Sequence, residues 1–173
     1  MKGSRFILVY VILVIAQILL RNYCNFTQYL AISFLPAMIM CLPLDKSTVS
    51  GMFIAFITGF IVDFLTDGQL GLTILALVPV ALVRRGVILA VFGEEVFSRG
   101  ENISFNRQGA EKIFLSIFML TSIFMLVFIA ADGAGTRPFW FNLVKFLISV
   151  LLSSAVSYFI AKLLCADYDS RWK

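Results

Sequence analysis

Long runs of hydrophobic residues, interrupted by short clusters of polar and charged residues, extend along the whole chain. A transmembrane helix needs about 20 predominantly apolar residues, and runs close to this length recur six times. The expected spans are residues 5–20, 28–44, 48–66, 70–83, 113–131 and 138–164. The pattern therefore predicts an all-α integral membrane protein with six transmembrane helices, forming a single polytopic membrane domain over residues 1–173.

The distribution of Lys and Arg predicts the orientation of these spans. With the N-terminus inside, eleven basic residues lie in cytoplasmic segments and two lie outside, which agrees with the positive-inside rule. The two outside are Arg21 and Arg137, and Lys145 falls within the sixth span. We expect both termini in the cytoplasm, short outer loops such as the turn at residues 67–68, and one longer cytoplasmic loop between the fourth and fifth spans.

The long loop opens with the apolar stretch VILAVF, residues 87–92. One interpretation is that this stretch lies in the membrane interface. The other is that it extends the fourth span, which would draw Arg84 and Arg85 into hydrocarbon. The first interpretation is favoured because a charge in hydrocarbon is costly.

The amino-acid composition excludes several classes of protein and of function. The chain is 61% hydrophobic and 14% charged, against about 45–50% and about 25% in soluble domains. Its net charge of +4 comes from scattered basic residues, without the basic and aromatic stripe expected of a nucleic-acid binder. The chain contains no histidine, which removes the commonest general base and metal ligand, and no catalytic motif is found. We therefore expect no enzymatic activity, no catalytic or metal-binding residues, no cofactor and no nucleic-acid partner.

Small residues recur every fourth position in two spans and predict close helix packing. Residues four apart share a helix face, and small ones let helices approach closely in lipid. They are Gly51, Ala55 and Gly59 in the third span, and Ser149, Ser153 and Ser157 in the sixth. Each row leads to a charge, Asp63 or Lys145, at a similar depth when the two spans are antiparallel. We expect these spans to pack together and Asp63 to pair with Lys145, because charges within a membrane usually pair inside the bundle. The alternative is that both side chains extend to the outer surface.

The stretch GFIVDFLTDGQLGL, residues 59–72, resembles the rod shape-determining protein MreD family. The resemblance rests on Gly59-Phe60-x-x-Asp63, on the Leu70-Gly71-Leu72 that opens the next span, and on Pro36 in the preceding span. Gly59, Asp63, Gly71 and Pro36 are the positions that match the family motif. Chain length and the six-span layout are also similar, whereas the last two spans add only their hydropathy.

The resemblance implies a non-enzymatic, multi-pass component of the bacterial inner (cytoplasmic) membrane that helps to maintain cell shape. Its implied partner is an MreC-like single-span protein. Through this partner it would be linked to an MreB-like actin homologue, a RodA-like transglycosylase and the elongation transpeptidase, and so to peptidoglycan synthesis.

Two other function classes remain open. One is the substrate-binding membrane component of a small-molecule (vitamin) transporter, in which Asp63 and Lys145 would furnish a polar pocket. The absence of long outer loops to cap such a pocket counts against this class. The other is a membrane enzyme acting on lipid-linked precursors, which would need more carboxylates or a histidine near one membrane face.

Overall fold

The fold is known from a computed structural model that describes residues 2–23, 31–43, 47–66, 70–93, 109–133 and 138–169. Within these residues the chain is helical or irregular, and no strand occurs. The helices are α1 (Lys2–Tyr23), α2 (Leu35–Met40), α3 (Thr48–Leu65), α4 (Leu72–Phe92), α7 (Ala110–Asp132) and α8 (Phe139–Asp169). All except α2 are long and apolar enough to cross a membrane. The all-helical prediction is confirmed, and five of the six expected spans correspond to long helices.

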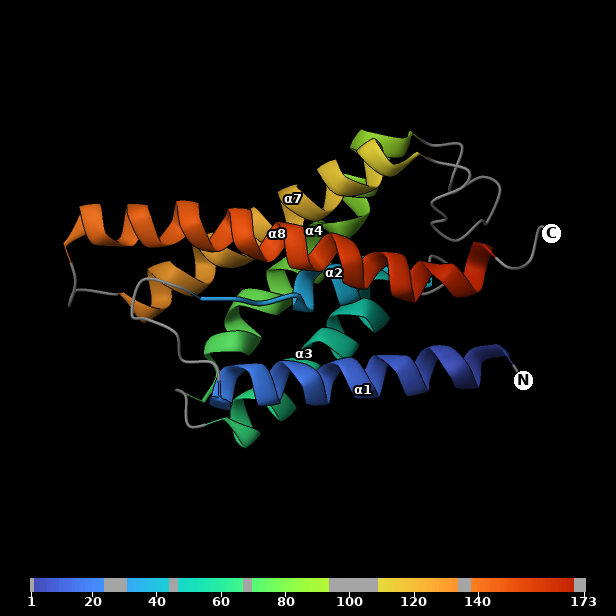
Figure 1. Cartoon of the computed structure of the whole chain (residues 1–173), viewed down its shortest axis with the longest axis horizontal. Coiled ribbons are helices and arrows are strands. Elements are labelled where there is room, and N and C mark those ends of the chain that lie inside the picture. Colours follow the sequence, from blue (N-terminus) through green and yellow to red (C-terminus); the bar gives the residue numbers. More distant parts are fainter. Residues whose placement is uncertain are drawn as a thin grey trace.

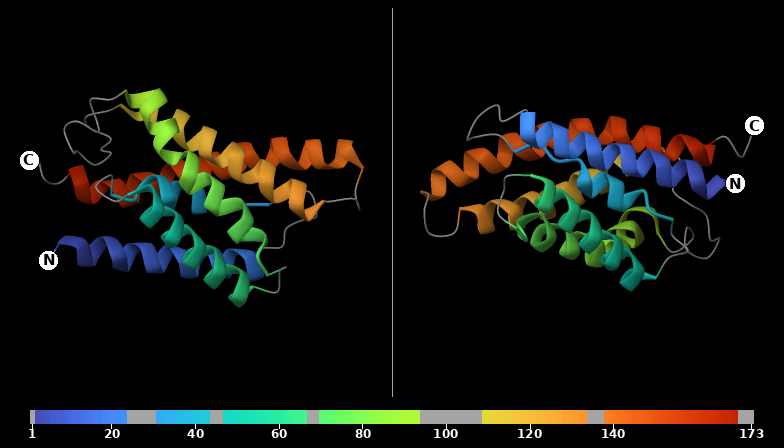
Figure 2. Two further views of the ribbon diagram at one scale, coloured as in Figure 1. Left: turned by 180° about the vertical axis from the view of Figure 1, so that it is seen from behind. Right: turned by 90° about the horizontal axis from the view of Figure 1, so that it is seen from below.

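Two antiparallel helix pairs form most of the bundle. α3 packs on α4, α7 packs on α8, and α4 joins the pairs by packing along α7. The short helix α2 lies inside, in contact with α4, α7 and α8 (Figure 1, Figure 2). α1 lies at the edge of the bundle, against α3, α8 and α2. Both ends of the chain lie on the same side of the bundle (Figure 1).

The second expected span is not a continuous helix. Of this range the structure describes residues 31–43, and within them only Leu35–Met40 are helical, preceded by irregular backbone at residues 31–34. The expectation of a spanning helix here is wrong, because prolines bracket the helical part. Pro36 occupies its first turn, where a missing N–H costs nothing, and the position before a proline disfavours helix. Pro43 acts in the same way at the other end, so the helix stops at Met40.

The fourth span is longer than expected. α4 continues through residues 87–92 and ends at Gly93, whose φ of 79° and amide bond to the Leu89 carbonyl close the helix. The interfacial interpretation of this stretch is therefore wrong. Arg84 does enter the bundle, where it is buried, and its guanidinium donates to the carbonyls of Met40 and Leu42. These carbonyls at the end of α2 supply the polar environment that hydrocarbon cannot.

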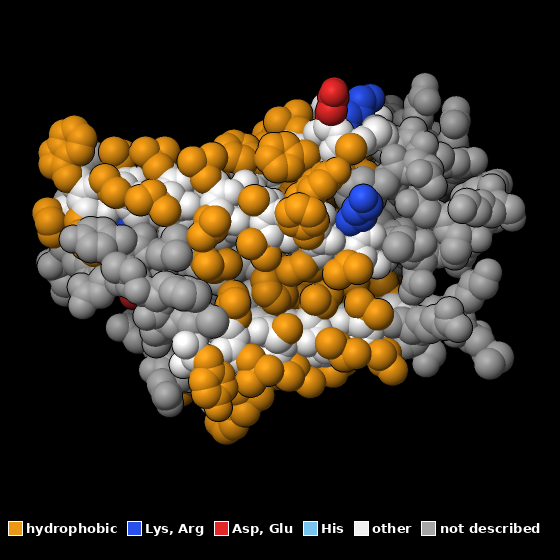
Figure 3. Space-filling view, viewed as in Figure 1, with side chains coloured by type: hydrophobic (Ala, Val, Ile, Leu, Met, Phe, Trp, Pro, Cys, Tyr) orange, Lys and Arg blue, Asp and Glu red, His pale blue; other side chains and the backbone are white. Residues whose placement is uncertain are grey.

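The surface of the bundle is strongly apolar. On the described part of the face seen in Figure 3, hydrophobic side chains are spread over the helices and few charged side chains appear. Outward-facing rows of large apolar residues run along α1 and α3, including Ile12 and Ile15 on α1 and Phe53, Phe60 and Phe64 on α3. Such continuous apolar cover is what a lipid environment requires and what a soluble protein avoids. The chain is accordingly a multi-pass membrane protein.

The expected outer turn at residues 67–68 lies outside the described residues, as do residues 94–108 of the cytoplasmic loop expected at 84–112.

Candidate functional site

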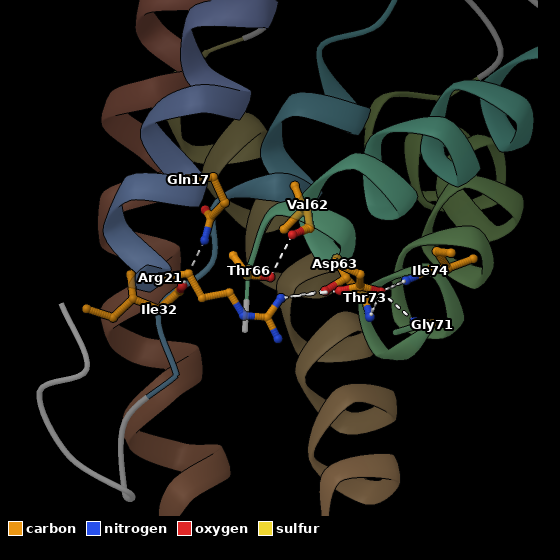
Figure 4. A network of polar contacts seen from close by, with 9 residues as sticks. All are labelled: Gln17, Arg21, Ile32, Val62, Asp63, Thr66, Gly71, Thr73 and Ile74. Atoms are coloured by element: carbon orange, nitrogen blue, oxygen red, sulfur yellow. Dashed lines mark hydrogen bonds and ion pairs between the residues drawn. The ribbon is translucent and has the colours of Figure 1, made fainter. Parts of the chain in front are cut away.

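Asp63 is the cap of a neighbouring helix. Its Oδ2 accepts N–H bonds from Gly71 at 3.0 Å, Thr73 at 3.0 Å and Ile74 at 3.4 Å, in the first turn of α4 (Figure 4). The first amides of a helix have no partner within the helix, and the helix dipole favours a negative charge there. Gly71 has a φ of 95°, a left-handed conformation that suits glycine and turns the chain into α4. An aspartate in an apolar helix is thus explained by the helix end that it satisfies.

Arg21 is the charged partner of Asp63. Its Nη1 lies 3.5 Å from Asp63 Oδ1 and donates to Thr73 Oγ1 at 2.6 Å. The guanidinium carbon also lies 5.2 Å from the ring centre of Phe128, a cation–π arrangement that adds a contact with α7. Arg21 thereby ties the end of α1 to the end of α3, the start of α4 and α7.

Lys145 pairs with Asp132, at 2.7 Å between Nζ and Oδ2. The expected pair between Asp63 and Lys145 is therefore wrong. Asp132 ends α7 and Lys145 lies near the start of α8, so the pair joins the adjacent ends of two consecutive helices. The sequence contained the signal: Arg21 and Asp132 are single charges at the ends of apolar runs, on the same side as Asp63 and Lys145.

The small-residue row on α3 contacts α4 rather than α8. α3 packs on α4 and α1, whereas α8 packs on α7, α2 and α1, so the expected packing of the third on the sixth span is wrong. A Cβ on Gly59 would lie 3.0 Å from Ile74 Cα and 3.1 Å from its nitrogen, which requires glycine at this crossing. Ala55 is fully buried, and Gly51 is buried but has open space, with no atom within 4 Å of where a Cβ would lie. Close approach of helices was correctly expected from these residues, but with the wrong partner.

The serine row on α8 binds the irregular backbone before α2. Ser149 Oγ accepts the N–H of Ala31 at 3.0 Å. Ser153 Oγ accepts the N–H of Ser33 at 3.1 Å and donates to the Ala31 carbonyl at 3.3 Å. Ser157 lies one turn further along the same face and is fully buried. The serines were expected to let α8 approach α3 closely, but Ser149 and Ser153 instead hydrogen-bond the backbone of residues 31–33.

Gln17 of α1 binds the same segment from the other side. Its Nε2 donates to the Ile32 carbonyl at 3.2 Å (Figure 4). Its Oε1 accepts the Phe34 N–H at 3.1 Å. The amide side chain thus pairs with the backbone as a neighbouring strand would. Together with Arg84 at the far end, side chains from α1, α4 and α8 satisfy a non-helical stretch inside a membrane protein. Non-helical backbone at membrane depth is tolerated only when it is buried and satisfied in this way.

The arrangement is one of structural polar contacts. The described carboxylates Asp63 and Asp132 each lie beside a basic side chain, and the serine and glutamine contacts above go to backbone groups. Among the described residues no group of three His, Cys, Asp or Glu side chains is placed to hold a metal ion. The motif positions Gly59, Asp63 and Gly71 lie where α3 meets the start of α4, whereas Pro36 lies in the first turn of α2.

Comparison of the chain with known protein families, with characterised proteins and with solved structures gave no match.

Proposed function

We propose that this chain is a non-enzymatic component of the bacterial cell-elongation machinery, of the MreD kind. The single observation that carries the proposal is the structural role of the motif residues where α3 meets α4. Gly59 permits the close crossing of α3 and α4, Gly71 turns the chain, and Asp63 caps α4. A motif that builds a rigid corner between membrane helices is expected of a scaffold, whereas a catalytic motif would leave its carboxylate available to a substrate.

The proposed topology has six crossings, with both termini in the cytoplasm of a bacterium and the protein in its inner membrane. Residues 31–43 make the second crossing. Residues 31–34 can span at most about 13 Å, the six residues of α2 about 9 Å, and residues 41–43 at most about 10 Å. These maxima add up to about 32 Å, against about 30 Å for the hydrocarbon core, and the turn at residues 41–42 shortens the segment, so flanking residues would complete the crossing. This crossing also agrees with the position of both chain ends on one side of the bundle (Figure 1).

The proposed partner is an MreC-like single-span membrane protein, which links the chain indirectly to MreB-like, RodA-like and transpeptidase components. The outward-facing apolar rows of α1 and α3 offer room for such a helix, because α1 buries little of its surface within the bundle. Partner binding needs no cofactor and no catalytic residue.

The proposal can be tested by measuring which proteins co-purify with the chain and whether it maintains rod shape. The tagged chain is expressed in a rod-shaped bacterium whose own MreD-like protein can be depleted, and it is purified from native membranes in a mild detergent. We expect recovery of the MreC-like protein, and rod shape maintained during depletion. An Asp63→Ala variant should lose both effects, whereas Gly51→Ala, at a position with open space beside it, should retain both. Rounded cells and no MreC-like protein with the unmodified chain at normal abundance would overturn the proposal.

A second candidate is a small-molecule carrier, and one observation favours it. Carriers often place their substrate sites at discontinuous membrane helices near the middle of the bilayer, and residues 31–43 are discontinuous and mostly buried. This candidate predicts that a small organic molecule and an ATP-driven energising module co-purify with the chain, in place of cell-wall synthesis proteins.

A further inference from the structure

Three hydroxyl groups inside the bundle have no hydrogen-bond partner from the protein. They are the side-chain oxygens of Ser33, Thr121 and Ser157. Thr121 and Ser157 are fully buried, and Ser33 is 7% exposed. A buried polar group without a partner costs about 1–3 kcal/mol, so three in one region require an explanation.

The positions of two of these hydroxyls, those of Ser33 and Ser157, follow from their relation to Ser153. The Ser33 N–H donates to Ser153 Oγ at 3.1 Å, so Ser33 lies directly beside this point of α8. Ser157 follows Ser153 by about one turn on the same face.

The position of the third hydroxyl, that of Thr121, follows from the packing of α7 on α8. Thr121 lies about two turns from Phe114 and about three turns from Asp132, so it shares their face of α7. Phe114 contacts Tyr158, with 6.0 Å between ring centres, and Asp132 contacts Lys145, so this face is turned toward α8.

The position of Thr121 along α7 also matches the positions of Ser153 and Ser157 along α8. Thr121 lies about 16 Å along α7 from Asp132. On α8, Ser153 and Ser157 lie about 12 Å and about 18 Å from Lys145, the partner of Asp132. Thr121 therefore sits at the level between Ser153 and Ser157, and the three hydroxyls gather around one point of α8 where the irregular segment enters the core.

We propose that this cluster, formed by Ser33, Thr121 and Ser157, is an internal water-binding site. Water is the occupant that fits: it both donates and accepts, as three hydroxyls of different orientation require, and it carries no charge. Buried waters in proteins typically make about three hydrogen bonds to polar groups that otherwise lack partners. Leu120, which precedes Thr121 on α7, and Ala161, about one turn after Ser157 on α8, are fully buried, and the cluster itself contains no charged side chain that could bind an ion.

The occupant completes the hydrogen bonding of the non-helical crossing. Gln17, Ser149 and Ser153 satisfy the backbone of residues 31–34, and water at the cluster satisfies the side chains that face the same region. The site is thus a structural element of the core, whichever function the protein has.

The direct test is solid-state NMR of the full chain in liposomes, with magnetisation transferred from water to labelled Ser and Thr residues. We expect clear transfer to Ser33, Thr121 and Ser157, and much slower transfer to Ser116. Ser116 is a matched control because it is fully buried on α7 but already donates to the Lys112 carbonyl. Slow transfer to all three cluster residues would overturn the proposal, as would a small organic molecule that co-purifies and is displaced by substitutions in the cluster.

A Thr121→Val variant gives an independent readout, because valine has nearly the same shape and no hydroxyl. If water occupies the site, the variant should lose the water signal at Ser157 and show a lower unfolding temperature. If the hydroxyl were dry, its removal would relieve an unpaired polar group and raise the unfolding temperature, which would contradict the proposal. Ser157→Ala, with the water signal read at Thr121, serves the same purpose if Thr121→Val does not accumulate.

Discussion

The ion pair between Asp63 and Arg21 leads to a quantitative prediction, because two different pairings of Asp63 can be separated by double-mutant cycles. Asp63→Asn and Arg21→Gln each remove one charge and keep the side chain polar. We expect the two substitutions to be coupled, since the groups lie 3.5 Å apart and both contact Thr73. Asp63→Asn and Lys145→Gln should be nearly additive, because Lys145 pairs with Asp132.

The magnitude follows from the contacts. Asp63 is 1% exposed, and its Oδ2 accepts three amide bonds that remain possible, but weaker, with an asparagine oxygen. Bonds to charged groups contribute about 1.5–3 kcal/mol and neutral ones about 1 kcal/mol, so Asp63→Asn should destabilise the protein by ~1–3 kcal/mol. At about 2–4 °C per kcal/mol for a chain of this size, the unfolding temperature should fall by ~2–12 °C.

The coupling energy between Asp63 and Arg21 should be about 0.5–2 kcal/mol, in the range measured for residues in direct contact. That between Asp63 and Lys145 should stay below about 0.5 kcal/mol. The assay is thermal unfolding of the purified variants in one detergent, with reversibility checked by rescanning.

Two outcomes would refute this reasoning. Strong coupling to Lys145 together with additivity toward Arg21 would restore the pairing expected from depth and spacing alone. A stabilising Asp63→Asn substitution would show that the carboxylate does not cap α4.

Three further predictions use the same measurement. Gly59→Val should destabilise the protein by ~1–3 kcal/mol because its Cβ would meet the α4 backbone, whereas Gly51→Ala should be neutral or stabilise it by up to about 1 kcal/mol; equal effects would contradict the assigned crossing. Gln17→Leu should cost ~2–4 kcal/mol because it leaves a backbone N–H and a carbonyl of the irregular segment unpaired, and a neutral result would argue against that segment's placement. Asp132→Asn should cost more than Lys145→Met, because the lysine left behind is 8% exposed and the aspartate left behind is 29% exposed; the reverse order would contradict the burial of Lys145.

The long helices could be predicted because hydropathy alone specifies them. The third span, expected at 48–66, is found at Thr48–Leu65, and the fifth, expected at 113–131, is found at Ala110–Asp132. Each is an uninterrupted apolar run that must be helical in lipid, since no water is present to satisfy its backbone. The small residues of the third and sixth spans were expected to lie in helix contacts, and all six of them are buried.

The second and fourth spans could not be predicted because their conformation depends on side chains elsewhere in the chain. Residues 31–34 can remain non-helical only because Gln17, Ser149 and Ser153 take over their backbone bonds. Arg84 can lie in the core only because residues 40–42 present carbonyls to it. A hydropathy pattern predicts that an apolar segment is helical and that an arginine marks the end of a span. Neither prediction holds when another segment supplies hydrogen-bond partners for the backbone or for the arginine.

The contacts of Asp63 show why membrane depth and residue spacing were not sufficient to predict its partner. Two helices with matching rows of small residues were available at the same depth, but α3 packs mainly on α4 and α8 packs mainly on α7. The nearest unsatisfied groups to Asp63 along the chain are the amides that open α4, eight to eleven residues away. A carboxylate one turn before a helix–helix turn can reach these amides without any long-range arrangement, and the helix dipole favours it there. The same local logic joins Asp132 to Lys145 across the next hairpin. An acidic residue near the end of a membrane helix should therefore first be tested as a cap of the following helix, and only then as a partner of a distant lysine.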